Sequence, residues 1–223
     1  MYGKVKLSKK QIKEDKFTTF MLNAKQQLSD SWQYYAIGFV VIVLIVSAVI
    51  FFQDMQKTQE IEAANIYSQG VANFRQTKYQ EALLTFQRIT DEHAGTESAQ
   101  HATYMQGKTN LMLRNYTESQ RFFELYISKY SSDKLKLAAA YAGIATGLEN
   151  LGQSAEAAEK FVAACNVDLN GPLVGDYHLS AMRNFLAVDD VASAQSHFET
   201  IKDNFAGSNL ETRATLLFAE KKK

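Results

Sequence analysis

The sequence repeats itself at an interval of about 37 residues, and this periodicity constrains the fold more than any other feature. YSQGVANF begins at residue 67 and YMQGKTNL at residue 104, so Tyr, Gln, Gly and Asn recur at the same spacing. Positions at relative offsets 0, 9, 12 and 16 define four copies, with a small residue third and phenylalanine fourth. The copies are Gly70, Tyr79, Ala82 and Phe86; Gly107, Tyr116, Ser119 and Phe123; Ala145, Ser154, Ala157 and Phe161; and Met182, Val191, Ala194 and Phe198.

Each copy predicts a pair of helices joined by a turn. The first position lies in helix A, where a small residue lets the partner helix approach closely, and the second position begins helix B. The third and fourth positions are four residues apart and share one face of helix B. A single pair cannot bury its apolar face, so the copies must stack. We therefore predict an all-α solenoid of about four helix pairs, with a repeat domain at 63–205, units at 63–99, 100–137, 138–174 and 175–208, and a capping helix with a basic tail at 209–223.

An apolar stretch precedes the repeats. Residues 36–52, AIGFVVIVLIVSAVIFF, form 17 consecutive uncharged residues, and Tyr34 with Tyr35 extends the run to 19. About 20 residues are needed to cross the hydrocarbon core of a bilayer, and Trp32 suits the membrane interface. A buried core helix and a cleaved signal peptide are the alternatives. Because the segment before the run is long for a signal peptide and no A-x-A-like site follows Phe52, we predict an uncleaved, single transmembrane helix at 34–52.

The charge distribution predicts the orientation of this segment. Residues 1–33 carry seven lysines against three acidic residues, whereas residues 53–223 carry 17 basic and 21 acidic residues. Basic residues on one flank of a span favour retention of that flank in the cytoplasm. We therefore expect a cytoplasmic N-terminus and an exported C-terminal part.

The segments that flank the span have their own expected roles. Residues 1–33 form a basic arm in which Phe17, Phe20 and Met21 follow helical spacing. The arm is either an amphipathic helix on the inner leaflet, with its lysines near anionic lipid, or a helix that docks on a membrane partner. Residues 53–62 contain neither glycine nor proline and predict an exposed helical stem.

The repeats resemble the tetratricopeptide repeat family. The segments YQEALLTFQ at 79–87 and LGQSAEAAEKF at 151–161 match the pattern of that family best. The interval here is slightly longer than the usual period of that family, and the proline that usually separates units is missing after the first two copies. The resemblance covers roughly residues 63–205 and implies a module that binds other proteins.

The recurring amides raise a question of register. Gln69 and Asn73 are four residues apart and share a helix face, and their equivalents in the second copy do the same. They could form an amide ladder that hydrogen-bonds a peptide in a concave groove, or they could face water or tie adjacent helices together. The unshifted register would place amides at core positions, which is costly, so we expect helix A of the first two copies to be rotated or its turn to be one residue shorter. The candidate partner-binding groove comprises Tyr67, Gln69, Val71, Asn73, Phe74, Tyr104, Gln106, Lys108, Asn110, Leu111 and Arg183.

Residues for catalysis or metal binding do not occur in suitable patterns. Gly107, Lys108 and Thr109 imitate the end of a phosphate-binding loop, but no glycine-rich turn precedes them. The four histidines are scattered and no H-E-x-x-H motif occurs. Cys165, the single cysteine, fits a small core residue better than a nucleophile. We therefore expect no enzymatic activity, cofactor, metal, nucleic acid or small-molecule substrate.

The order of the segments resembles the YfgM-type ancillary subunits of the bacterial SecYEG translocon, in which a cytoplasmic arm and one span precede a periplasmic repeat domain. That resemblance is architectural. It implies a bacterial inner-membrane location and, as partners, Sec translocon subunits, periplasmic chaperones or exported chains. The long links and the run FFELYISKY at 122–130 also resemble repeat domains of outer-membrane assembly and Tol–Pal coordination proteins. A cell-envelope scaffold of that kind is the alternative.

Overall fold

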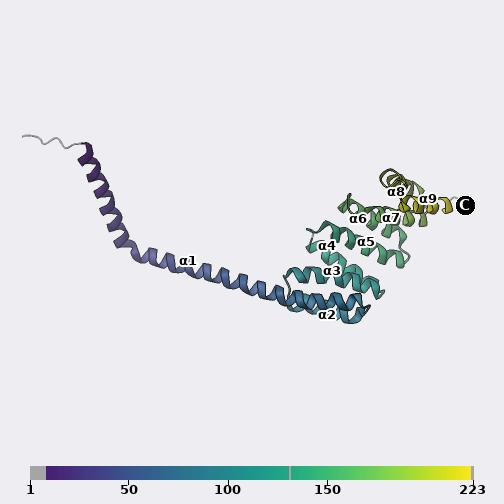
Figure 1. Ribbon diagram of the computed structural model, residues 1–223, viewed down its shortest axis with the longest axis horizontal. Coiled ribbons are helices and arrows are strands. Elements are labelled where there is room, and N and C mark those ends of the chain that lie inside the picture. The colour runs from purple at the N-terminus through teal and green to yellow at the C-terminus, as the bar shows by residue number, and fades with distance from the viewer. Residues whose placement is uncertain (1–8, 131, 222–223) are drawn as a thin grey trace, which may run out of the picture. The chain divides into compact units, whose positions relative to one another are not determined.

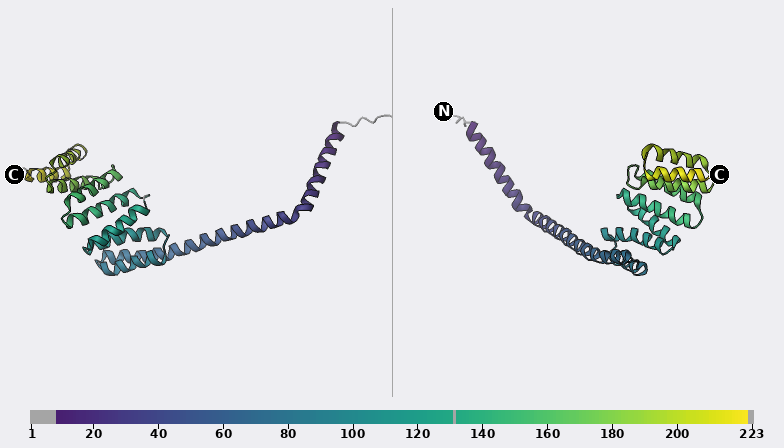
Figure 2. Two further views of the ribbon diagram at one scale, coloured as in Figure 1. Left: turned by 180° about the vertical axis from the view of Figure 1, so that it is seen from behind. Right: turned by 45° about the vertical axis from the view of Figure 1, so that its right-hand side comes forward.

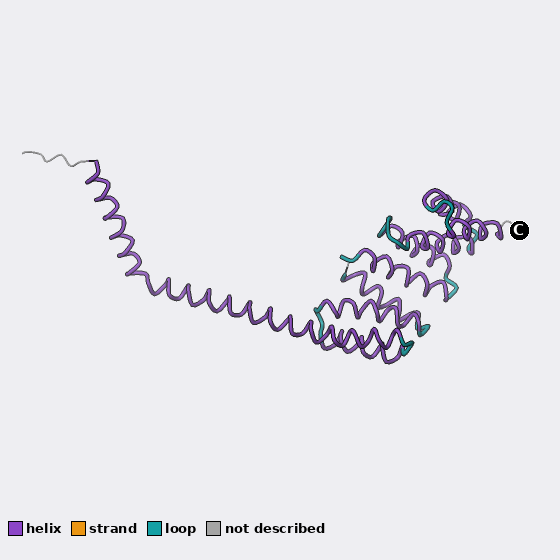
Figure 3. Tube along the Cα trace, viewed as in Figure 1, coloured by secondary structure: helices purple, strands orange, loops and turns teal. Residues whose placement is uncertain are grey.

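The computed structural model describes residues 9–130 and 132–221 of the chain, and helices joined by short turns account for this part of it (Figure 1 and Figure 3). The chain divides into two compact units, Met1–Gln56 and Lys57–Lys223. The expected all-α fold is therefore confirmed for the described residues.

The first unit consists of the N-terminal part of a long helix, α1 (Lys9–Arg75). Large apolar side chains along it are exposed, from Tyr34 at 77% to Phe52 at 59%. By length and composition alone, the segment Trp32–Arg75 is suitable to cross a membrane. Residues 1–8 of the predicted basic arm lie outside the described residues.

The second unit is a stack of helix pairs (Figure 2). The C-terminal part of α1 pairs with α2, each later A helix pairs with the B helix that follows it, and α9 packs on α7 and α8. This arrangement confirms the predicted solenoid of helix pairs with a capping helix. The helices are α2 (Tyr79–Glu92), α3 (Glu97–Met112), α4 (Tyr116–Lys129), α5 (Lys134–Asn150), α6 (Ser154–Val167), α7 (Val174–Ala187), α8 (Val191–Asn204) and α9 (Asn209–Lys221).

The repeat positions have the structural roles that their spacing predicts. The second position of each copy is the first residue of helix B in all four pairs. The third position is at most 1% exposed in every copy. In the first two copies the fourth position packs against the first, because a Cβ atom built on Gly70 would lie 2.6 Å from Phe86 Cε1 and one built on Gly107 would lie 2.7 Å from Phe123 Cδ1. The absence of a side chain in helix A therefore makes room for the phenylalanine of helix B.

Phe123 also joins two neighbouring pairs. Its ring lies between Gly107 of its own helix A and Gly143 of α5, where a built Cβ atom would lie 2.6 Å from Cζ of the same ring. The side chain is 2% exposed. With glycine on both sides, the ring sets the spacing between α3, α4 and α5.

The four turns between helices A and B share one hydrogen-bonding pattern. In the first turn the Lys78 N–H donates to Asn73 O and the Thr77 N–H donates to Phe74 O, both at 3.0 Å. These are the two hydrogen bonds of a Schellman motif, and Thr77 has the left-handed backbone that the motif requires, with φ of 62°. The equivalent residues of the later turns are Arg114, Gly152 and Asp189, with φ of 61°, 77° and 61°.

The identical turns settle the register of the first two A helices. Their turns are not shorter, and Gly70 and Gly107 face the phenylalanines of their own pairs. The expectation of a rotated helix or a shortened turn is therefore wrong. The unshifted register instead buries Gln106 at 1% and Asn110 at 2% exposure.

A contact that the sequence did not indicate joins α1 to α3. The Glu60 carboxylate accepts hydrogen bonds from Glu97 N at 2.6 Å and from Ser98 N at 3.1 Å. It therefore caps the positive N-terminus of α3. Glu60 lies in the segment expected to be an exposed stem, and it fastens the first helix pair to the second.

We predict opposite effects for two glycine-to-alanine substitutions on α5. Gly143→Ala forces a methyl group into the Phe123 ring and should destabilise the fold by about 1–3 kcal/mol. Gly147→Ala is the matched control, because its nearest neighbour would be Tyr116 Cβ at 3.7 Å, an ordinary contact. It should stabilise α5 by up to about 1 kcal/mol through helix propensity. Denaturant unfolding of the two variants tests this, and equal effects would contradict it.

Two histidines pair between the last A and B helices. The Nδ1 atoms of His178 on α7 and His197 on α8 are 2.7 Å apart, and Phe185 stacks on the His197 ring. Burial, followed by the charge of His197, lowers the pKa of His178 to about 4. Burial also lowers the pKa of His197. The folded chain therefore holds both rings neutral.

We predict that the folded state loses stability as the pH falls from about 6.5 toward about 4. Over this range the unfolded chain binds protons that the folded chain excludes, so stability is complete above the ordinary histidine pKa and declines below it. His178→Gln should flatten the decline in melting temperature across this window. His101→Gln, which removes a histidine outside the pair, is the control. Equal pH profiles for wild type and His178→Gln would refute the assignment.

Candidate functional site

The A helices are the C-terminal part of α1 and the helices α3, α5 and α7, and the side of the array that they form is called the helix A face. Polar contacts connect each A helix to the next. Lys108 of α3 places Nζ 5.3 Å from the centroid of the Phe74 ring on α1, within range of a cation–π contact. Lys136 Nζ of α5 lies 3.3 Å from His101 Nδ1 of α3. The first three A helices are thus linked in sequence.

The next link is a charged network. The Arg183 guanidinium on α7 binds the Glu149 carboxylate on α5 through two hydrogen bonds, of 2.8 and 2.9 Å. Asn184 Nδ2 donates to Glu149 Oε1 at 3.1 Å and to Ser180 O at 2.9 Å. A bidentate arginine–carboxylate pair fixes geometry as well as charge, so this network holds α5 and α7 in register.

Aromatic rings on the A helices pack inward against the core of the pairs. Tyr67 lies between Phe86 and His101, with centroid separations of 5.8 and 5.9 Å. Tyr104 makes edge contacts with Phe123 and Tyr126. Burial raises the pKa of both Tyr67 and Tyr104, so both phenols are protonated at neutral pH.

The structure separates the eleven predicted groove residues into three groups. Gln69, Lys108 and Arg183 are exposed. A second group is partly buried and packs within or between helix pairs, namely Tyr67, Val71, Asn73, Phe74, Tyr104 and Leu111. Gln106 and Asn110 are buried and turn toward the B helices instead. A role for any of them in partner binding remains a prediction.

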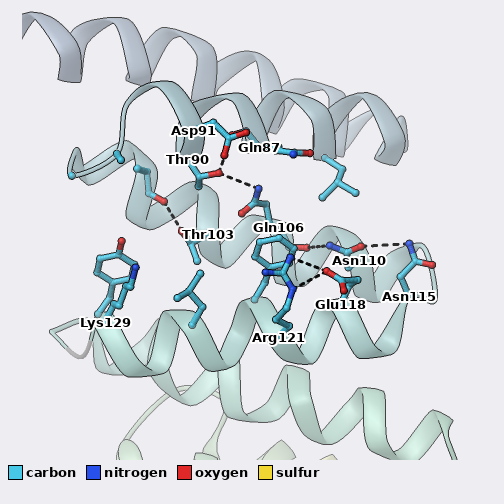
Figure 4. Close-up of a pocket in the computed structure, with 17 residues that line it drawn as sticks. Gln87, Thr90, Asp91, Thr103, Gln106, Asn110, Asn115, Glu118, Arg121 and Lys129 are labelled. Atoms are coloured by element: carbon cyan, nitrogen blue, oxygen red, sulfur yellow. Dashed lines mark hydrogen bonds and ion pairs between the residues drawn. The ribbon is translucent and has the colours of Figure 1, made fainter.

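The two buried amides lie in the floor of a groove between the B helices α2 and α4 (Figure 4). The groove has a volume of about 630 Å³. Gln106 Nε2 donates to Thr90 Oγ1 on α2 at 3.3 Å, and Asn110 Nδ2 donates to the backbone carbonyl oxygen of Gln106 at 2.9 Å. Asn115 Nδ2 reaches Asn110 Oδ1 at 3.4 Å. Three amide side chains thus line the groove, and those of Asn110 and Asn115 contact each other directly.

The next unit fills the same two positions with apolar side chains. Ile144 and Leu148 on α5 are the equivalents of Gln106 and Asn110 in the third copy, and they are 2% and 5% exposed within an apolar cluster. The fold therefore accepts hydrocarbon at this place. The sequence shows amides at positions that the repeat pattern assigns to the core. The burial of Gln106 and Asn110 was nevertheless not predicted, because such burial is costly.

Side chains with reactive chemistry are not gathered in this part of the fold. Within residues 9–130 and 132–221 no three His, Cys, Asp or Glu side chains are placed to hold a metal ion. Cys165 is 1% exposed in the third helix pair, as expected for a core residue. Burial raises the pKa of its thiol to about 12, which disfavours the nucleophilic thiolate.

The helix pairs stack, polar contacts connect their A helices, and a groove lies between two of their B helices. This architecture is that of a helical-repeat protein. The family of tetratricopeptide repeat-like domains matches residues 25–168. The chain belongs to this family. No curated protein matches it significantly.

Solved structures with the same fold include a bacterial and a fungal repeat protein. The chain is 19% identical to MamA, residues 41 to the end, from Desulfovibrio magneticus RS-1, with a TM-score of 0.56 over 66% of this chain and 77% of that one. It is 13% identical to the nearly identical TPR-like repeats of a kinesin light chain candidate from Podosopora anserina, with a TM-score of 0.57 over 72% and 85%. At these identities the likeness concerns the fold alone.

We predict that Gln106→Met stabilises the protein by about 1 kcal/mol, because it removes a buried acceptor that lacks a hydrogen-bond partner among the described residues. The equivalent change Gln69→Met, at the exposed matching position of the first copy, should alter stability by less than about 0.5 kcal/mol. Paired denaturant curves measure the difference. A loss of stability in Gln106→Met would mean that the amide serves the fold.

Proposed function

We propose that this chain is a membrane-anchored scaffold that binds protein partners on the periplasmic side of the bacterial inner membrane. Residues 1–33 serve as the cytoplasmic arm, 34–52 as the span and 53–62 as the stem. The protein works as an accessory of the Sec translocon and passes exported chains to periplasmic chaperones. It performs no catalysis, in keeping with families of this fold, which are generally non-enzymatic.

The observation that carries this proposal is the dual character of α1. The same helix presents apolar side chains that the chain leaves exposed between Tyr34 and Phe52, and contributes Ala63, which is fully buried in the first helix pair. An apolar segment of this length with exposed side chains is suited to lipid. The lysine excess before it supports a cytoplasmic N-terminus.

The helix A face supports the partner-binding part of the proposal. Lys108 exposes a basic group over the half-buried ring of Phe74, and Arg183 is exposed on the same face in its pair with Glu149. Arginine and aromatic residues are enriched where proteins bind proteins. The mixture suits extended chains that carry both apolar and acidic side chains.

Photo-crosslinking from the helix A face in native membranes tests the proposal. A photoreactive amino acid at Lys108 of the full-length chain should capture translocon subunits and periplasmic chaperones. The control places the same group at Glu159, which is exposed on the B helix α6, and should capture them several-fold less.

The identity of the captured proteins separates the alternatives. Outer-membrane assembly or Tol–Pal proteins in place of translocon subunits would favour the cell-envelope scaffold. Capture of cytoplasmic proteins alone would show that the orientation is the reverse of the one proposed. Equal capture from Lys108 and Glu159 would show that the helix A face is not the partner-binding surface.

A further inference from the structure

The groove between α2 and α4 contains a buried hydrogen-bond acceptor that the described residues leave unused. Gln106 is 1% exposed, and its Oε1 atom has no hydrogen-bond partner within the described part of the chain. Its Nε2 atom makes one hydrogen bond, at 3.3 Å to Thr90. An unsatisfied buried acceptor costs free energy, and Ile144 at the same position of the next unit shows that the fold does not require an amide there.

The dimensions of the groove suit a short extended segment. Its floor runs along α3 from Ala99 to Asn110. With a rise of about 1.5 Å per helical residue this is roughly 16 Å, the length of about five residues of extended chain. The volume of about 630 Å³ falls within the usual range of ligand sites.

The walls favour a ligand without strong net charge. Asp91 and Glu118 are balanced by Arg121 and Lys129, and Arg121 is already paired with Glu118 at 2.8 Å. A groove with balanced charges does not concentrate phosphate or nucleic acid. A neutral backbone is therefore a better match than an ionic ligand.

Apolar side chains lie between these polar groups. Leu83 on α2 and Phe122 and Leu125 on α4 line the groove and are each partly buried. Alternate side chains of an extended strand point to opposite sides. Such a strand can set apolar side chains against these walls while its backbone follows the polar floor.

We infer that this groove is a second binding site, separate from the helix A face, for an extended peptide segment of a protein partner, with a backbone N–H of the peptide donating to Gln106 Oε1. A primary amide offers an acceptor and a donor in one plane, which matches the N–H and C=O groups of a peptide. The terminal torsion of glutamine is soft, so rotation about it turns Oε1 toward the ligand.

Photo-crosslinking with a peptide library tests the site. The full-length chain in lipid nanodiscs carries a photoreactive amino acid at Gln87, an exposed residue of the groove rim on α2 (Figure 4). The probe is a random library of acetylated and amidated pentapeptides. The control carries the same group at Glu124, the equivalent exposed position of α4 outside the groove. We expect several-fold more peptide captured from Gln87 than from Glu124.

Two further variants decide between the groove and the helix A face. Gln106→Met should lower capture from Gln87 by at least about fivefold, the effect of one lost hydrogen bond, while the protein stays folded as judged by its melting curve. Lys108→Ala, on the helix A face, should leave capture unchanged. The inference is overturned by equal capture from Gln87 and Glu124, by full capture in Gln106→Met, or by a matching loss in Lys108→Ala.

Discussion

The stacking of the first helix pairs depends on one recurring contact, in which a phenylalanine of helix B enters the space left by a glycine of helix A. In the second pair the contact is doubled, because Phe123 lies between Gly107 and Gly143. A packed interior leaves such a ring little freedom to shift. The contact therefore closes the first two helix pairs, and Phe123 also sets the distance from the second pair to the third. The groove between α2 and α4 lies over this part of the stack.

The stacking produces two surfaces of different character. On the helix A face, side chains from successive pairs meet and satisfy one another, as Arg183 does with Glu149. On the other side, the helices α2 and α4 leave a groove over α3. Gln106 and Asn110 occupy positions in its floor that the next pair fills with Ile144 and Leu148. The groove thus reflects a departure of one unit from the pattern of its neighbour.

The helix pairs could be predicted from the sequence because the positions that control their packing recur at the same spacing in each copy. Each B helix begins at the predicted residue, the small third position is buried in every copy, and the phenylalanine is buried in the first three. The burial of Gln106 and Asn110 was not predicted, because the cost of burying amides argued against the register that the chain adopts. Contacts between pairs, such as that of Glu60 with the N-terminus of α3, do not recur from copy to copy. No sequence pattern therefore indicated them. The groove was missed for the same reason, since its walls come from two different units.

The geometry of α3 relates the two surfaces to each other. Lys108 and Gln106 are two residues apart, which corresponds to about 200° around a helix, so one contacts Phe74 on the helix A face and the other contacts Thr90 in the groove. A single helix can therefore contribute to two sites on opposite sides of the array. With both proposed sites on one scaffold, a partner held at either one would be present at a raised local concentration for the other. For a scaffold anchored and employed as proposed above, that arrangement would favour retention of a partner over tight binding at a single site.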